Sequence, residues 1–434
     1  MGYPEFIKHE LDNTIAKALS TSDFANNLKP SRRRNLSKAD VIRTLMFMQG
    51  GSLQKELYEA GLSITPSAFV QRRHQIEPNV LSDALADFFQ KCEAPKTYLG
   101  YRVLAIDGTA INMPRDPKSA CFVCNASAPQ GYCQMHANPL YDVLNKCYLD
   151  CVIQPQPRQD EIGALLFMLA WRDFPGKTLI VADRAYSSYN LFATIQKMQN
   201  VDFLIRIKHG QGAMREVAKL PMCELDREIS FTITTTQTKE DKEKGYIFLQ
   251  TQKKDAERTY SANTRKGRWD FPSPYPMKLR IVRILLDTGE YETLATSLPP
   301  SFTPNQLKQL YHARWGIETA FRELKYNYGL VNLHGKSEKF VRQEIYAAML
   351  MASACSRIIQ QAVIQQHTGN THLYQVNQKM AIFLCKKFFR TPGADGEQLM
   401  RDIARYTEPI RPGRQDERKI RAKTFEGFVY RVAA

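Results

Sequence analysis

Hydrophobic and polar positions along the first 95 residues repeat with helical spacing and predict a series of short helices. Within residues 38–48 the apolar side chains share one helical face, and Ser37 followed by Asp40 resembles a capping box. A second helix is expected over residues 52–60. A third is expected over residues 67–75, where the preceding Pro66 suits a first helical turn. Two short helices, a turn and a third helix predict a helix-turn-helix-like region within residues 1–95, with a plain helical bundle as the alternative.

The pattern changes near residue 96, where strands begin to alternate with helices. Residues 101–107 form an apolar run that finishes on Asp107, and residues 178–183 repeat this pattern and finish on Asp183. Such alternation predicts an α/β sheet whose interior strands are covered on both faces. The other expected elements are two strands within 140–154, helices over 160–171 and 188–198, and a strand over 201–208.

Residues 210–300 interrupt the alternation with strand-like stretches that have no helices between them. These stretches are 228–236, 246–252, 279–286 and 292–297, joined by polar, lysine-rich connections. They predict a β-rich insertion into the α/β domain, and from residue 301 the pattern is helical again. The expected divisions are therefore a helical region 1–95, a core 96–209, an insertion 210–300, a second core part 301–370 and a basic C-terminal region 371–434.

The charge balance narrows the class of partner. The 434 residues carry 60 Lys and Arg against 44 Asp and Glu, a formal charge of +16. Such an excess favours a polyanionic partner, because each neutralised phosphate releases condensed counterions. Candidate DNA contacts are Arg72 and Arg73 on the third helix, Arg184 and Lys208 at the ends of core strands, and a basic tail; ordinary surface charge is the alternative. The tail residues are Arg411, Arg414, Arg418, Lys419, Arg421 and Lys423.

Cysteine usage and hydropathy bear on location. Nine scattered cysteines indicate reduced thiols rather than a disulfide framework. The first residues lack the order of a signal peptide, and no apolar run reaches the ~20 residues that span a bilayer. We therefore expect a cytoplasmic, nucleoid-associated bacterial protein with no membrane partner. Cys121, Cys124, Cys133 and His136 have the ligand types of a structural Zn²⁺ site, although free thiols in a polar loop are the favoured interpretation.

Carboxylates supply the candidate chemistry. Asp107 and Asp183 each follow a strand, at the edge where open α/β sheets place their ligands. A divalent cation would relieve their mutual repulsion, and hard oxygen ligands select Mg²⁺ or Mn²⁺. A pair of such ions can serve phosphoryl transfer. An Asp that caps a turn after a strand is the alternative.

A third carboxylate stands in the segment 311–325. On a continuous helix, Tyr311, Arg314, Glu318 and Lys325 would form one polar stripe beside an apolar face. A Glu flanked by Arg, Lys and a phenol suits metal binding next to phosphates, whereas an isolated Glu on such a helix would be read as part of a solvated salt-bridge network.

The four spacings of this segment resemble the Tyr-Arg-Glu-Lys signature of the insertion-sequence-4 family of DDE transposases. The sequences around Asp107 (Ala-Ile-Asp-Gly-Thr) and Asp183 (Val-Ala-Asp-Arg-Ala-Tyr) are also similar to those of that family. The resemblance covers roughly residue 30 to the end. It implies an RNase H-like core, a β-rich insertion between the second and third carboxylates, and Asp107, Asp183 and Glu318 as ligands of two Mg²⁺ or Mn²⁺ ions.

The resemblance also implies roles for the neighbouring residues and a reaction. Tyr311, Arg314 and Lys325 would contact phosphates of double-stranded transposon ends, which the enzyme cuts through a hairpin and inserts into target DNA, acting as a homodimer. Where the family can supply a Trp as an aromatic platform, this sequence has Tyr291. Two other functions stay open: an RNase H-like nuclease without strand transfer, and a catalytically idle DNA-binding protein descended from a transposase.

Overall fold

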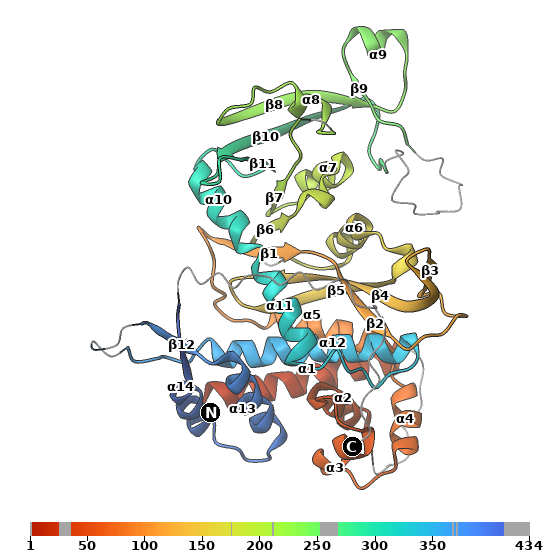
Figure 1. Ribbon diagram of the computed structural model, residues 1–434, viewed down its shortest axis with the longest axis vertical. Coiled ribbons are helices and arrows are strands. Elements are labelled where there is room, and N and C mark those ends of the chain that lie inside the picture. Colours follow the sequence, from red (N-terminus) through yellow and green to blue (C-terminus); the bar gives the residue numbers. More distant parts are fainter. Residues whose placement is uncertain are drawn as a thin grey trace.

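A mixed eleven-stranded sheet runs through the structure (Figure 1). The computed structural model describes residues 2–25, 36–174, 176–210, 212–251, 268–366, 369 and 372–411. The main path of the sheet has the order β2-β4-β1-β6-β7-β11-β10-β8-β9, and β3 and β5 pair with β4. With its N-terminal helices, the chain therefore has the mixed α/β class that the sequence predicts.

The central strands β1, β6 and β7 are parallel, and the long strand β4 runs antiparallel to β1 on its other side. Side chains alternate across β1, so Val103 packs on one face and Leu104 and Ile106 on the other. This burial on both faces explains the unbroken apolar run. The strands of this half are β1 (Tyr101–Ile106), β2 (Thr109–Met113), β3 (Phe122–Asn125), β4 (Ala128–Asp142), β5 (Cys147–Pro155), β6 (Lys177–Ala182) and β7 (Val201–Arg206).

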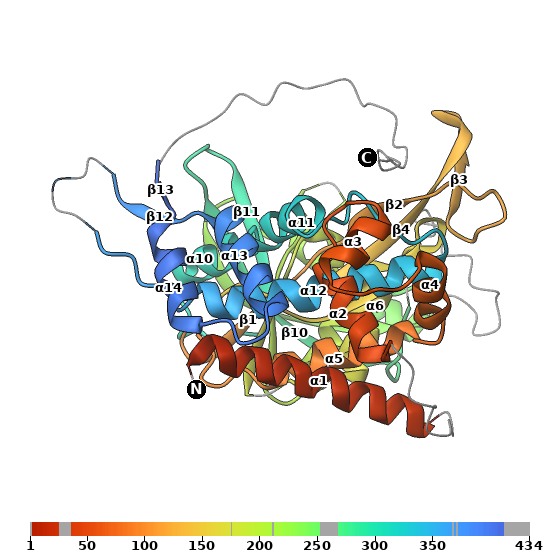
Figure 2. The ribbon, with the colours of Figure 1, turned by 90° about the horizontal axis from the view of Figure 1, so that it is seen from below.

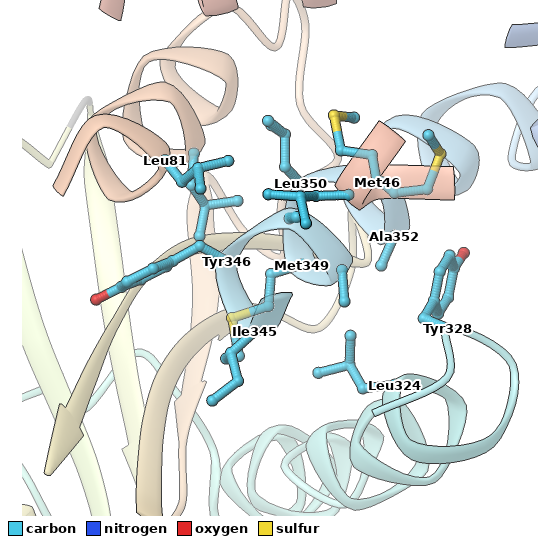
Figure 3. Packing of buried hydrophobic residues seen from close by; sticks show 14 of the residues in the cluster. Met46, Leu81, Leu324, Tyr328, Ile345, Tyr346, Met349, Leu350 and Ala352 are labelled. Atoms are coloured by element: carbon cyan, nitrogen blue, oxygen red, sulfur yellow. The ribbon is translucent and has the colours of Figure 1, made fainter. Parts of the chain in front are cut away.

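Helices cover both faces of these strands. On one face α6 (Glu161–Trp171) and α7 (Tyr189–Lys197) pack over β5 and β7, as the sequence predicts. On the other lie α10 (Pro304–Ala313), α11 (Gly316–Tyr326) and α12 (Glu338–Ile359). The long helix α12 is buried along most of its length. Its Met349 and Leu350 belong to one buried cluster with Met46 from the N-terminal region and Leu324 of α11, and its Tyr346 lies on the side of Leu81 (Figure 3).

The N-terminal region confirms the three predicted short helices but also contains a long one that was not predicted. Helix α1 spans 23 residues and packs on α5 and α12, so it belongs to the same core (Figure 2). The predicted capping box of Ser37 and Asp40 and the Pro66 start are both present. The helices are α1 (Tyr3–Ala25), α2 (Lys38–Phe47), α3 (Leu53–Glu59), α4 (Pro66–His74) and α5 (Pro78–Gln90).

One residue of α4 corrects the sequence analysis. Arg73 is 2% exposed, forms an ion pair of 2.9 Å with Glu344 and donates a hydrogen bond to Gln343, both on α12. Its guanidinium also lies 4.5 Å from the centre of the Phe340 ring. The prediction that Arg73 contacts DNA is therefore wrong, because this arginine fastens α4 to the core. Arg72 is half-buried at the surface, where it donates a hydrogen bond to Gln75.

The predicted β-rich segment contains strands but continues the sheet. Strand β11 pairs antiparallel with β7, and β10 and β8 follow outward. The predicted insertion and the part of the chain that contains β1, β6 and β7 therefore share one sheet (Figure 1). Its elements are α8 (Arg215–Ala218), β8 (Leu225–Thr234), α9 (Lys239–Glu243), β9 (Ile247–Phe248), β10 (Tyr275–Leu285) and β11 (Tyr291–Thr296).

The C-terminal region packs beside α1 and α12. It is helical as expected, with a small two-stranded sheet added. Of the predicted basic tail, only Arg411 falls within the described residues. In the described part of the chain, no helix has the length and apolar character to cross a membrane. The elements are β12 (Tyr374–Val376), α13 (Gln378–Arg390), α14 (Gly396–Arg405) and β13 (Thr407–Pro409).

Candidate active site

Asp107 and Asp183 follow neighbouring parallel strands in matching register. Ile106 of β1 pairs with Ala182 of β6, so the next residue on each strand is one of the two carboxylates. Asp107 accepts a hydrogen bond of 2.9 Å from the backbone N–H of Gly108. Asp183 caps the short 3-10 helix η2 (Arg184–Tyr186) by accepting from the N–H of Ala185. Local turns thus fix both carboxylates at one edge of the sheet.

Arg314 links this edge to the third candidate carboxylate. Its Nη1 lies 3.4 Å from Asp107 Oδ2, and its Nη2 lies 3.3 Å from Glu318 Oε1. The arginine side chain is only 6% exposed, whereas that of Glu318 is 40% exposed. Asp107 and Glu318, far apart in the sequence, therefore flank one buried guanidinium.

The segment 311–325 is not one continuous helix, which corrects the expected stripe. Helix α10 ends at Ala313 and α11 begins at Gly316, with Arg314 and Trp315 in the turn between them. The N–H of Ile317 bonds to the carbonyl of Arg314, an i→i+3 contact of the 3-10 type. The residue whose side chain contacts both Asp107 and Glu318 therefore lies in the turn between the two helices.

Tyr311 and Lys325 therefore lie on different helices. Tyr311 on α10 is buried, and its ring centre is 5.8 Å from the Arg314 guanidinium. Lys325 lies in the last turn of α11, where partial burial lowers the pKa of its ammonium. Trp315 is exposed and its ring centre lies 5.1 Å from the same guanidinium.

The charges of the site act on Asp107. The pKa of its carboxyl is raised from 3.8 to about 6: burial is the largest cause, the nearby Asp183 and Glu161 add to the rise, and the Gly108 N–H and Arg314 act against it. Like-charge repulsion of this kind is what a bound cation relieves.

A basic cavity adjoins this edge. Arg184, Arg206, Lys208 and His209 line a hollow of about 290 Å³ beyond the ends of β6 and β7. Arg184 and Lys208 are exposed, while Arg206 lies 3.8 Å from the buried carboxylate of Glu292. The cavity places positive charge beside Asp183.

The cysteines and histidine considered for zinc are engaged separately. The Cys124 thiol contacts the Pro129 carbonyl, Cys133 Sγ accepts from the Asp116 N–H, and His136 Nε2 lies 2.9 Å from Glu161. Among the described residues, no three His, Cys, Asp or Glu side chains form a metal-binding group.

Four further acids near the core have partners in the structure. Asp142 pairs with Arg102, Asp150 pairs with Arg172, and Asp160 caps α6. Glu161 pairs with His136 and also helps to raise the pKa of Asp107. Its place in the sequence, directly after the Asp160 cap, gives no signal of this proximity to Asp107.

Comparison with known protein families agrees with this geometry. Residues 98–354 match the transposase DDE domain, a stretch that includes Asp107, Asp183 and Glu318. The chain belongs to this family. As a DDE transposase it is an enzyme of DNA transposition that transfers phosphoryl groups on DNA, and enzymes of this family generally use divalent metal ions.

Two further comparisons concern solved structures and curated proteins. A solved structure described as a piggyBac transposase synaptic complex with hairpin DNA is similar at 12% sequence identity and a TM-score of 0.43. The match covers 96% of this chain and 87% of that one. No curated protein matches the chain.

Proposed function

We propose that this DDE transposase is a cut-and-paste enzyme of the insertion-sequence-4 group, which cleaves transposon ends and joins them to target DNA. Asp107, Asp183 and Glu318 are its catalytic carboxylates. The observation that carries the proposal is the contact of Arg314 with both Asp107 and Glu318, beside Asp183 on the next parallel strand. The Tyr-Arg-Glu-Lys spacings support the group assignment.

The core is of the RNase H-like type. Three features support this: the strand order β5-β4-β1-β6-β7, the antiparallel β4 beside β1, and the parallel strands β6 and β7. Helices α6 and α7 follow β5 and β6 in the chain and pack over the sheet. In this arrangement the carboxyl ends of β1 and β6 form the catalytic edge.

The donor set fits Mg²⁺ or Mn²⁺, because all three side chains offer hard carboxylate oxygens and the charge of Asp107 is disfavoured without a cation. Two such ions, when bound, activate the attacking oxygen and stabilise the leaving oxygen of the phosphoryl transfer. Asp107, Asp183 and Glu318 hold the ions. A structural Zn²⁺ has no place in this proposal, since the Cys and His donors are separately engaged.

The neighbouring side chains position the DNA. Arg314 contacts two of the carboxylates, and its fork geometry would suit a bidentate grip on a phosphate. Tyr311 supports the guanidinium from α10, and Lys325 acts as a point charge. Arg184 and Lys208, lining the basic cavity, contact phosphates farther along the strand.

Recognition and assembly complete the proposal. Helix α4 presents Arg72 at the surface and reads the inverted-repeat ends. Two copies hold two ends in a homodimer, each end passes through a hairpin, and the enzyme works with the bacterial nucleoid in the cytoplasm.

The decisive experiment is strand transfer with the DNA that flanks the gene. A pre-cut end should be joined to a target plasmid in Mg²⁺, whereas an RNase H-like nuclease would cut the end but give no joined product. An idle DNA-binding descendant would retard the end in a gel and neither cut nor join it. Either of these results would contradict the proposed function.

A further inference from the structure

In the folded chain, the backbone of the residue after Asp107 lies directly against two side chains. A Cβ built on Gly108 would overlap the Oε1 atom of Glu161 and the Nε2 atom of His136. The backbone of Gly108 does not adopt a positive φ, so close approach rather than conformation explains the glycine. The absence of a side chain at position 108 brings this pair against the backbone beside a catalytic carboxylate.

His136 and Glu161 form a defined pair in this contact. His136 lies on β4 with 9% of its side chain exposed, and its Nε2 is 2.9 Å from Glu161 Oε1. The other ring nitrogen, Nδ1, is buried and has no hydrogen-bond partner in the described part of the chain. The imidazole therefore fixes Oε1 of Glu161. The glutamate side chain is 28% exposed, so its second oxygen can meet an ion or a water molecule.

Glu161 lies in the electrostatic field of the catalytic edge. It is among the charges that raise the pKa of Asp107. Burial raises the pKa of the Tyr186 phenol, and the charges of Glu161, Asp107 and Asp183 raise it as well; the buried hydroxyl has no partner within the described residues. Tyr186 is the last residue of η2, three residues after Asp183, so the charge of Glu161 acts on groups beside both strand ends.

A purely structural role explains Glu161 less well. The N-terminus of α6 is already capped by Asp160, which accepts from the N–H of Gly163. An acid in the first turn adds only about 0.3–1 kcal/mol through the helix dipole. That contribution requires neither a histidine partner nor a glycine at position 108.

We infer that Glu161 is a fourth carboxylate of the metal site, oriented by His136 and brought beside Asp107 by the absence of a side chain at position 108. It adds negative charge and a hard oxygen donor to the edge formed by Asp107 and Asp183. This inference rests on the proposed function, because it assumes that Asp107 holds a divalent cation.

The test is Mn²⁺ binding to the purified full chain without DNA, followed by electron paramagnetic resonance. Glu161→Gln should raise the Mn²⁺ Kd by about 10–100-fold, as loss of an outer ligand does at other metal sites. Glu323→Gln is the matched control: this glutamate is also half-buried and lies on α11, but its charge partners are Lys146 and Arg322. It should leave the Kd unchanged.

Asp107→Asn separates this inference from the proposed function. If Asp107→Asn weakens Mn²⁺ binding and Glu161→Gln does not, the fourth carboxylate is wrong and the proposed site stands. If Asp107→Asn binds as the wild type does, the proposed metal site fails and this inference fails with it. Glu161→Asp keeps the acidic first turn of α6 but withdraws the carboxylate from His136, so it too should weaken binding; wild-type affinity would overturn the inference.

Discussion

Replacing Asp107 with Asn should stabilise the metal-free protein at neutral pH. Burial raises the pKa of Asp107 from 3.8 to about 6 in the folded state. Its contribution to stability is therefore complete below about pH 4 and is lost as the pH rises through about 6. Each pKa unit is worth about 1.4 kcal/mol, so the charged carboxyl costs the folded state at most about 3 kcal/mol. The side chain is 26% exposed, and solvent screening makes this an upper bound.

The assay is urea unfolding of both proteins in EDTA at several pH values. The free energy of unfolding of Asp107→Asn should exceed that of the wild type by about 1.5 kcal/mol more at pH 8 than at pH 5. Added Mg²⁺ should then stabilise the wild type selectively, since a ligand of the folded state raises its stability by mass action. A difference between the two proteins that stays constant from pH 5 to pH 8 would refute the reasoning.

Three further predictions concern the other site residues. Asp183→Asn and Glu318→Gln should abolish Mg²⁺-dependent end cleavage while DNA binding in Ca²⁺ stays near normal. Undiminished cleavage by either variant would exclude that residue as a metal ligand, and undiminished cleavage by the wild type in EDTA would exclude the metal site itself. Arg314→Ala and Lys325→Ala should slow cleavage or joining more than they weaken end capture, measured by single-turnover kinetics and gel shift; a loss confined to capture would contradict their position at the reacting phosphate. Arg73→Ala should lower the free energy of unfolding by about 3–5 kcal/mol in urea melts, because it breaks a buried ion pair; a stable variant with reduced DNA affinity would restore it as a DNA contact.

The sequence predicts the strands that carry the two aspartates because their burial on both faces leaves a continuous apolar run. The short helices α2, α3 and α4 are predicted equally well, since caps at Ser37, Ser52 and Thr65 mark where each begins. The apolar runs and the helix caps both lie within a few residues of the elements they mark, so a single sequence is enough to show them. The roles assigned to the site residues and the domain boundaries stay predictions.

Tertiary contacts explain what the sequence did not predict. The sequence suggests that Arg73 lies on the surface. The folded chain pairs it with the buried Glu344, which is distant along the chain. The turn at Arg314 and Trp315 occurs in a segment with good helical spacing, where Gly316 directly after Trp315 is a weak local signal of a break. The role inferred for Glu161 depends on its proximity to Gly108, which lies in the connection between β1 and β2 and is close only in the folded chain.

The pairing of β11 with β7 has a consequence for engineering this enzyme. Residues between β7 and α10 look like a cassette that can be exchanged, yet they supply the hydrogen-bond partner of a strand beside the catalytic edge. Cutting the chain at β11 would leave the backbone groups of β7 as an open edge, which invites aggregation. Chimaeras should instead be joined at the outer end of the sheet, beyond β8, so that β10 and β11 remain with the catalytic half.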